Sequence, residues 1–164
     1  MSEKEHVLEK LKQWQIPFEI HEHPPAATVE EALPYWREID ASHCKNLFFR
    51  NHKGNRHYLV ILDHLRQLRI RDLEQRLKQG KLTFASPERM KRYLGVSGGS
   101  VSVFGLLNDS NRHVHLFLDA RLKSARRISF HPNDNTATVV ISFDSLIEFL
   151  DRCGHSYEFI DLYD

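Results

Sequence analysis

The stretch CKNLFFRNHKGNRHYLVIL, residues 44–62, decides the fold that this sequence predicts. Two apolar runs, 46–50 and 57–62, stand on either side of Lys53-Gly54-Asn55, and a short polar turn between apolar runs is typical of a β-hairpin. Lys45 and Asn46 lie where the first run enters the expected core. A cation and an amide at that position need polar partners, which either the protein or a ligand supplies.

Helix signals occur on both sides of this hairpin. Ser2 with Glu5 forms a capping box, and a helix follows that ends at Pro17. Thr28 with Glu31 opens a second, short helix that we expect Pro34 to stop. Further helices are predicted at 71–79, between the cap Ser86 and the stop Gly95, and over 142–154.

Strand signals are interspersed with these helices. Besides the hairpin, strands are predicted at 17–20, 114–119 and 136–142, and a closing edge strand at 157–162. Residues 21–27 and 95–105 are expected to be irregular, because prolines and glycines interrupt them. We therefore expect an α/β or α+β fold with a mixed, largely antiparallel sheet and surrounding helices, organised as a single domain over 1–164.

Composition is that of an ordinary globular chain. The chain is 41% hydrophobic and 27% charged, which is normal for a globular protein. A chain of 164 residues is long enough to bury a core without disulfides or metal. Cys44 and Cys153 form no CxxC pattern, which suits reduced thiols. The charged N-terminus lacks a signal-peptide pattern, and no apolar run reaches membrane-spanning length. These features predict a soluble cytoplasmic protein without a membrane partner.

Charge is distributed unevenly along the chain, although the net charge is only +1. Residues 1–44 and 142–164 each have a net charge of −5, whereas 45–141 has a net charge of +11. The densest basic segment, 66–92, has nine Lys or Arg and three Asp or Glu. This pattern suits an anionic partner such as nucleic acid, and it equally suits a solvated helical surface.

Metal and nucleophile motifs are weak in this sequence. His21-x-His23 and His113-x-His115 have the spacing of two ligands on one strand face, but no third ligand stands at a diagnostic spacing. No GxSxG elbow and no recognisable nucleophilic cysteine is present. We favour surface or loop histidines and predict neither a metal nor a cofactor.

Two polar loops are stronger candidates for a binding site. GGSVSVFG at 98–105 contains adjacent glycines, which allow main-chain N–H groups to approach a carbonyl or a phosphate closely. HPNDNTAT at 131–138 is a polar turn before a strand and would place His131 at a pocket rim. Each loop is also explained by a tight turn with no ligand.

Several short motifs occur in an order that resembles one known family. The chain resembles the YbaK/prolyl-tRNA synthetase editing-domain family, specifically the free-standing branch called PrdX or ProXp-ala, from about Glu5 to Leu162. The motifs that carry the resemblance are Thr28-Val-Glu-Glu-Ala, Cys-Lys45-Asn46-Leu-Phe, Leu-x-Phe84-Ala-Ser86, Leu94-Gly95-Val-x-x-Gly99-Ser100-Val101-Ser102, Gly105-Leu-x-Asn108-Asp109, Asp119 and His131-Pro132-x-x-Asn135-x-x-Thr138.

The resemblance implies a trans-editing aminoacyl-tRNA deacylase, an ester hydrolase that removes a wrong amino acid from tRNA. The branch implies alanine on the tRNA for proline as the substrate, no metal or other cofactor, and the acceptor end of that tRNA as partner. Prolyl-tRNA synthetase is a second partner that the family suggests.

The resemblance also implies roles for individual residues. Lys45 would lie by the 3′ end of the substrate, the loop 99–103 would position the ester carbonyl and the water, and His131 would lie next to the aminoacyl group. The predicted catalytic residues are Lys45, Gly99, Ser100, Val101, Ser102 and His131. The predicted substrate-binding residues are Asn46, Thr28, Val103, Phe104 and Asn135. The predicted tRNA-binding residues, from the basic segment, are Arg66, Arg69, Arg71, Arg76, Lys78 and Lys81.

One departure from the family pattern keeps other functions open. Val103 stands where the family loop usually has proline, so loop rigidity, rate or substrate choice can differ. The first alternative is a catalytically silent module that binds tRNA or a synthetase. Others are a deacylase for cysteine, serine or threonine, and a hydrolase of a different small ester or nucleotide that uses a metal held by the histidine pairs.

Overall fold

The 44–62 stretch forms the predicted hairpin in the computed structural model, which describes residues 1–163. Strands β2 (Ser42–Asn51) and β3 (His57–Asp63) pair antiparallel, with Cys44 opposite Asp63 and Arg50 opposite His57. Gly54 in the turn has a φ of +73°, which a residue with a side chain rarely adopts. Asp164, the last residue of the predicted domain, lies outside the described residues.

The hairpin is the centre of an eight-stranded mixed sheet, so the predicted α+β fold class is confirmed. The strand order is β1-β7-β6-β2-β3-β5-β8, with β4 also paired to β2. Three neighbouring pairs are parallel, β2 with β6, β3 with β5 and β5 with β8, and the others are antiparallel. The remaining strands are β1 (Glu19–Glu22), β4 (Leu82–Phe84), β5 (His115–Asp119), β6 (Arg127–Phe130), β7 (Ala137–Ser142) and β8 (Tyr157–Ile160).

Most helices begin and end at the residues that the sequence indicates. Ser2 forms its capping box with Glu5, Ser86 accepts from the N–H of Arg89, and Gly95 ends its helix with a φ of +69°. The α-helices are α1 (Glu3–Gln13), α2 (Val29–Trp36), α3 (Ile70–Leu77), α4 (Pro87–Leu94) and α5 (Phe143–Cys153). The 3-10 helices are η1 (Gly98–Ser100), η2 (Val103–Asn108) and η3 (Ala120–Ser124).

Helix α2 corrects one expectation, because Pro34 does not stop it. Thr28 caps the helix as predicted, but the helix continues through Pro34 to Trp36. Proline removes a single N–H donor, and the helix ends only two residues later, so little hydrogen bonding is lost. The two residues after Pro34 include Trp36, which is 8% exposed and stacks on the ring of His43.

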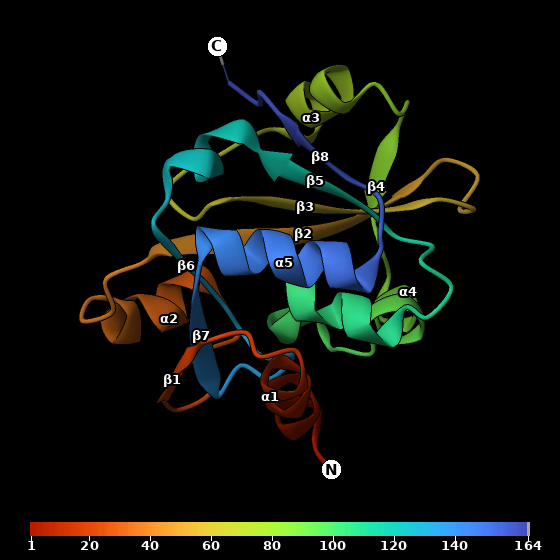
Figure 1. The fold of residues 1–164 in the computed structure, drawn as a ribbon. Helices are drawn as coiled ribbons and strands as arrows, with labels where there is room; N and C mark the ends of the chain where they lie inside the picture. The colour runs from red at the N-terminus through yellow and green to blue at the C-terminus, as the bar shows by residue number, and fades with distance from the viewer. Residues whose placement is uncertain (164) are drawn as a thin grey trace.

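Apolar side chains on the two faces of the sheet enter different clusters. Alternation along β2 sends Phe48 into the cluster that α1, α4 and α5 cover, and sends Phe49 into the cluster that α3 covers. Figure 1 shows α5 lying across the sheet and α3 at the far end beside β8. A third, smaller cluster packs α2 against Val140 of β7.

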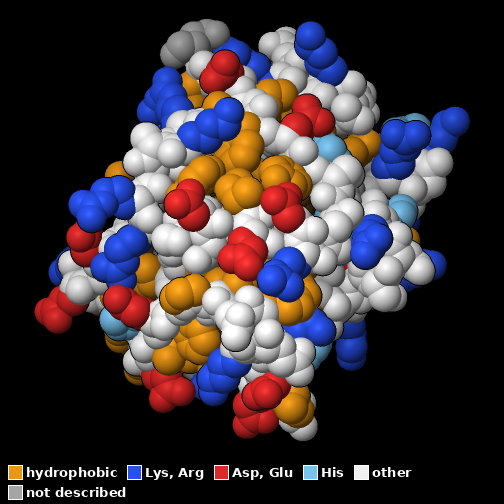
Figure 2. All heavy atoms as spheres, viewed as in Figure 1, with side chains coloured by type: hydrophobic (Ala, Val, Ile, Leu, Met, Phe, Trp, Pro, Cys, Tyr) orange, Lys and Arg blue, Asp and Glu red, His pale blue; other side chains and the backbone are white. Residues whose placement is uncertain are grey.

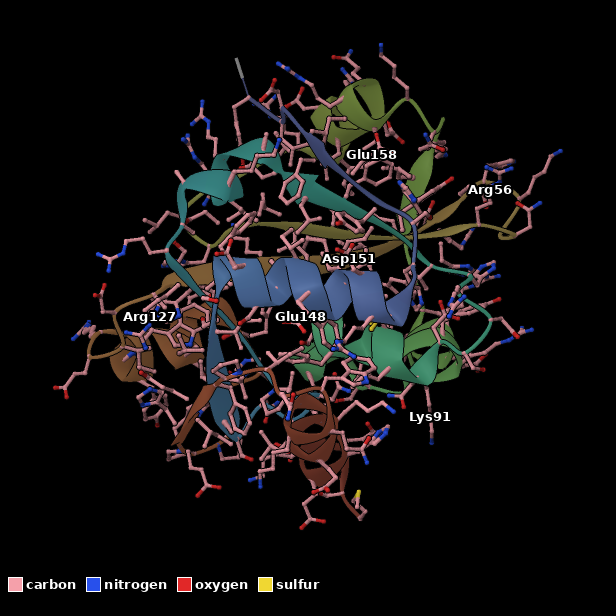
Figure 3. The ribbon with its side chains drawn as sticks, in the orientation of Figure 1. Arg56, Lys91, Arg127, Glu148, Asp151 and Glu158 are labelled. Carbon is pink, nitrogen blue, oxygen red and sulfur yellow. The ribbon has the colours of Figure 1, made fainter. Side chains whose placement is uncertain are left out.

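Charged side chains cover much of the surface. Figure 2 shows Lys and Arg side chains spread over the viewed face with Asp and Glu between them, around an apolar band. Figure 3 shows Glu148 and Asp151 on α5 and Glu158 on β8. The hydroxyl of Tyr157 donates to Asp151 (2.9 Å) and links β8 to α5. No helix within residues 1–163 has the length and apolarity needed to cross a membrane.

Candidate functional site

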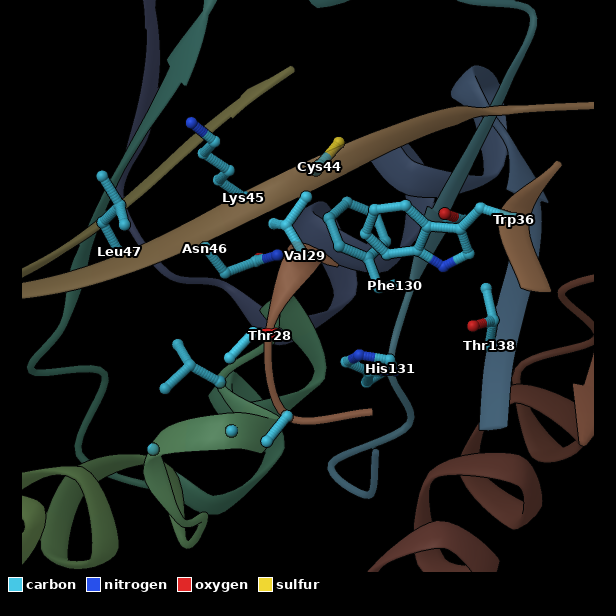
Figure 4. Close-up of a pocket in the computed structure, with 15 residues that line it drawn as sticks. Thr28, Val29, Trp36, Cys44, Lys45, Asn46, Leu47, Phe130, His131 and Thr138 are labelled. Carbon is cyan, nitrogen blue, oxygen red and sulfur yellow. The ribbon is translucent and has the colours of Figure 1, made fainter. Parts of the chain in front are cut away.

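A cavity of about 200 Å³ lies where β2, α2, β6 and η1 meet. Figure 4 shows its walls, with strand β2 above and the loop that enters α2 in the middle. The tertiary structure brings together residues that are more than 100 positions apart in the chain. The lining residues are Ala27, Thr28, Val29, Trp36, Cys44, Lys45, Asn46, Leu47, Gly98, Gly99, Val101, Ser129, Phe130, His131 and Thr138.

Six of the predicted site residues line this cavity. They come from four separate segments of the chain, namely the α2 cap, strand β2, the η1 turn and the end of β6. Four were predicted as catalytic and two as substrate-binding. They are Lys45, Gly99, Val101 and His131, with Thr28 and Asn46.

Five other predicted site residues do not line the cavity. Ser102, Val103 and Phe104 are 0% exposed, and Ser102 accepts from the N–H of Phe104 (3.2 Å) to cap η2. Ser100 is also buried, and Asn135 lies behind Gly99. Val103 is the first residue of η2, a position where proline and valine are both accommodated. The departure from the family proline therefore falls in the core rather than on the cavity wall.

Lys45 has a protein partner for its ammonium group. Its Nζ donates to the main-chain carbonyl of Arg66 at 2.6 Å. Figure 4 shows the Lys45 side chain on the opposite side of β2 from Asn46, as strand alternation requires. Lys45 thus ties β2 to the chain after β3, and its predicted contact with the substrate's 3′ end stays a prediction.

Asn46 and the η1 turn have polar groups beside the cavity that lack a protein partner within residues 1–163. The Asn46 Oδ1 atom is buried and has no hydrogen-bond partner among the described residues. The first N–H groups of a helical turn have no partner within it, and the η1 cap residue Ser97 makes no side-chain bond to them. Gly98 and Gly99 supply these N–H groups and line the cavity.

His131 is held in one tautomer at the cavity wall. Its Nδ1 donates to the main-chain carbonyl of Ala137 (2.7 Å), so Nε2 carries the lone pair in the neutral ring. Burial lowers the pKa of His131 from 6.5, the Ala137 carbonyl opposes this shift, and the nearby His23 reinforces it. The ring is therefore neutral at pH 7 and offers Nε2 as a hydrogen-bond acceptor.

The sequence analysis missed two histidine–hydroxyl pairs beside this cavity. His43 Nδ1 lies 2.5 Å from Ser129 Oγ, and His23 Nε2 lies 2.9 Å from Thr138 Oγ1. Strand β6 was not predicted, so nothing indicated that His43 and Ser129 are direct neighbours in a parallel pairing. A polar residue on each of two apolar strands was the only available signal.

Cys44 lines the cavity but has no nucleophilic character. It is buried, and burial raises the pKa of its thiol far above the ordinary value, with Asp63 and Asp119 adding to the shift. The thiolate, which is the reactive form, is therefore absent at neutral pH. Burial also raises the pKa of the Cys153 thiol, to about 12, so the same reasoning applies to the second cysteine.

The histidine pairs that the metal alternative invoked bind protein groups. His23 Nδ1 donates to the carbonyl of Pro24, and His115 contacts Ser156 and Glu158. His113 lies 2.8 Å from Nδ1 of His57. Within residues 1–163, no group of three or more His, Cys, Asp or Glu side chains is arranged to hold a metal ion.

The predicted tRNA-binding residues lie on and around α3. Arg66 and Arg76 are half-buried, and Arg66 packs over the ring of Tyr163 (4.7 Å to the centroid). The other four, Arg69, Arg71, Lys78 and Lys81, are exposed. The main-chain carbonyl of Arg66 accepts from Lys45, a residue of the cavity wall, but Arg66 itself does not line the cavity.

Comparisons with known proteins agree on one family. The model described as "Aminoacyl-tRNA editing domain" matches residues 23–149. The chain is 36% identical to the prolyl-tRNA editing protein ProX of Acetoanaerobium sticklandii, over 99% of both chains. It is 32% identical to prolyl-tRNA synthetase associated domain-containing protein 1 of Bos taurus, over 90% of this chain and 88% of that protein.

Solved structures share the fold. The structure of a candidate trans-editing enzyme for prolyl tRNA synthetase superposes with a TM-score of 0.72 at 19% identity and covers 98% of each chain. That of a hypothetical protein, APE2540, gives a TM-score of 0.71 at 19% identity, covering 94% of this chain and 97% of that one. At this level of identity the likeness concerns the fold alone.

Proposed function

The chain belongs to the aminoacyl-tRNA editing domain family, and from that premise we propose that it hydrolyses the ester between a mischarged amino acid and tRNA. The family assignment confirms the resemblance that the motifs predicted. The observation that carries the proposal is the small cavity, because six residues predicted from the motifs meet on its walls. A cytoplasmic location would follow from this role in translation.

We propose alanine on the tRNA for proline as the substrate. A synthetase pocket shaped for proline cannot strongly exclude a smaller side chain, because a methylene is worth only about 1–3 kcal/mol of discrimination. A second site with a smaller cavity is then needed to hydrolyse the wrong amino acid from the mischarged tRNA. The cavity of about 200 Å³ has apolar walls that include Val29, Trp36 and Phe130, which suits a small aliphatic side chain. The names of the relatives support the prolyl system.

Hydrolysis would use main-chain groups rather than a side-chain nucleophile. The N–H groups of Gly98 and Gly99 would donate to the ester carbonyl oxygen and stabilise the negative charge that develops on it. Water adds to the carbonyl carbon, the bond to the ribose oxygen breaks, and that oxygen leaves with a proton. His131 would lie beside the aminoacyl group, and no metal enters this scheme.

Removing the Lys45 side chain tests both the class of reaction and the role of this residue. We expect the wild type to deacylate alanyl-tRNA for proline, and Lys45→Ala to lower kcat/KM by about 10- to 100-fold, the range for losing a charged hydrogen bond. Initial rates with the alanyl-, cysteinyl- and seryl-charged tRNA measure this effect and the substrate preference.

The exposed Lys53 on the hairpin supplies a matched control, since Lys53→Ala removes the same side chain away from the cavity. We expect that variant to keep wild-type rates. If the wild type deacylates none of the three tRNAs, the silent binding module becomes the better assignment. If chelator abolishes activity, the metal-dependent alternative gains support instead.

Binding of tRNA should depend strongly on salt if the α3 segment contacts phosphates. Four exposed cations, Arg69, Arg71, Lys78 and Lys81, would give roughly a 100-fold loss of affinity between about 50 and 200 mM salt. The double variant Lys78→Gln/Lys81→Gln should reduce the log–log slope by about one to two. Fluorescence titration at several salt concentrations measures both quantities.

The control for this prediction is Lys12→Gln/Lys53→Gln, which removes two exposed lysines outside the α3 segment. We expect it to leave the slope nearly unchanged. An equal change of slope in the two double variants would show that general charge, and not the α3 segment, attracts the tRNA.

A further inference from the structure

Three histidines beside the cavity are each fixed by a main-chain carbonyl. A carbonyl oxygen can only accept, so the ring nitrogen that faces it carries the hydrogen, and in the neutral ring the other nitrogen is an acceptor. The three bonds are His23 Nδ1 to Pro24 O (2.9 Å), His43 Nε2 to Ile39 O (3.2 Å) and His131 Nδ1 to Ala137 O (2.7 Å). The protein backbone therefore determines which side of each ring accepts.

Two of these acceptor nitrogens determine the direction of a hydroxyl hydrogen. Ser129 must donate its hydrogen to His43 Nδ1, and Thr138 must donate its hydrogen to His23 Nε2. Ser129 is 2% exposed and Thr138 is 1% exposed, so neither side chain has space to turn. Both line the cavity, and Figure 4 shows the Thr138 hydroxyl on the side of its strand that faces His131. Their oxygens therefore offer only lone pairs to a ligand.

The third histidine contributes its acceptor directly. His131 Nε2 has no hydrogen-bond partner among the described residues, and His131 lines the same part of the cavity as Thr138. Ser129, Thr138 and His131 together form what we call the acceptor wall. Ser129 and Thr138 are uncharged and the His131 ring is neutral, so the wall has no charge, and no Asp or Glu is among the residues that line the cavity.

We propose that the acceptor wall binds the α-amino group of the aminoacyl ester and selects esters of free amino acids over esters without that amine. An α-amino group offers two or three N–H donors, and the wall offers three acceptors. A ligand carbonyl or phosphate has only acceptors and would leave the wall unsatisfied. The inference rests on the proposed function, because it specifies which part of the proposed substrate this wall binds.

The test compares three esters of one tRNA that differ only at the α-carbon. Alanyl, lactyl and propionyl esters carry an amino group, a hydroxyl and a hydrogen there and have nearly equal size, so exclusion by volume is held constant. Each kcat/KM is divided by the spontaneous hydrolysis rate of the same ester. We expect this normalised kcat/KM to decrease in the order alanyl, lactyl, propionyl, by roughly tenfold for each hydrogen bond lost.

Variants of the wall separate amine recognition from a structural role. Thr138→Val keeps the shape and removes the acceptor, so it should lower the alanyl reaction about tenfold more than the propionyl reaction. Thr138→Ser should restore the alanyl rate. Ser129→Ala should act in the same way as Thr138→Val. His43 is a positioning residue, so adding His43→Phe to Ser129→Ala should change the alanyl-to-propionyl ratio little further.

Two outcomes would overturn the inference. The first is an equal normalised kcat/KM for the alanyl and propionyl esters. The second is an equal loss for all three esters in Thr138→Val, which would show a structural role alone. Binding of the corresponding 3′-amide analogues, which are not hydrolysed, measures the amine preference without turnover. Absence of turnover together with a preference for the alanyl amide would reject the proposed function and retain the acceptor wall.

Discussion

Gly99→Ala is expected to lower the rate of ester hydrolysis by about 100-fold or more, the range for losing one main-chain donor to a developing oxyanion. A Cβ atom on Gly99 would lie 2.7 Å from Cβ and 3.0 Å from Cα of Ala27, and 3.1 Å from Nδ2 of Asn135. Two of these atoms belong to a neighbouring segment of chain that cannot rotate away. The η1 turn must therefore move, and the N–H groups that it presents to the cavity move with it.

The adjacent glycine provides a matched control for this prediction. A Cβ atom on Gly98 would meet only Sδ of Met90, at 3.8 Å, which is an ordinary van der Waals contact. We expect Gly98→Ala to keep activity within about threefold of wild type and Gly99→Ala to remain folded, since overpacking costs about 1–3 kcal/mol. Single-turnover rates and thermal unfolding measure the two effects. Equal activities of the two variants would contradict a role for close packing at Gly99.

The second large effect concerns stability, at the buried Asp109. Its Oδ2 accepts from the N–H of Val114 (2.7 Å) and from Nε2 of His155 (3.0 Å), and Asp109 and His155 are each 5% exposed. Asp109→Ala leaves both donors buried without an acceptor, so we expect the free energy of unfolding to fall by about 3–5 kcal/mol. Asp109→Asn keeps one acceptor oxygen, so we expect a smaller loss. Urea unfolding at pH 7 measures these differences.

The stability that Asp109 provides should disappear in acid. Burial raises the pKa of Asp109, but the hydrogen bonds from His155 and Val114 outweigh burial and lower it below 3.8 overall. A carboxylate with a lowered pKa contributes its full stability above 3.8 and loses it as the pH falls through its folded-state value. The gap between wild type and Asp109→Asn should therefore narrow as the pH falls below about 4. A gap that persists unchanged at lower pH would show that the ionised carboxylate is not its cause.

Local sequence signals predicted the helices and strands whose turn, cap or stop residues lie within or next to them. The hairpin of β2 and β3 has a glycine turn between apolar runs, and α4 has a cap, a proline at its first position and a glycine stop. These signals act within a few residues, so one sequence is enough to interpret them. Strands β4 and β6 are short and lack such signals, and they form because the edge of β2 opposite β3 offers pairing positions at its two ends.

The sequence motifs identified part of the candidate site but not the directions in which its side chains point. Lys45 and Asn46 are adjacent in sequence and were predicted together, yet they lie on opposite sides of β2. Alternation along a strand makes this inevitable, but only the tertiary packing of α2 and η1 beside β2 makes both residues part of the cavity lining. The loop 98–105 divides in the same way, because Gly98, Gly99 and Val101 reach the cavity and Ser102 to Phe104 enter the core.

The family, the α+β class, the helix caps and three residues of the cavity wall, Lys45, Gly99 and His131, could be predicted from the sequence, because motifs and caps depend on short-range order along the chain. The direction of the Ser129 and Thr138 hydroxyls, which leaves their lone pairs toward the cavity, could not be predicted without the folded structure. That outcome requires β2 to lie beside β6 and the 23–24 segment to reach β7, contacts between segments 86 and 115 residues apart. Each hydroxyl takes its direction from a histidine, and each histidine takes its tautomer from a backbone carbonyl, so the chemistry of this wall exists only once the chain has folded.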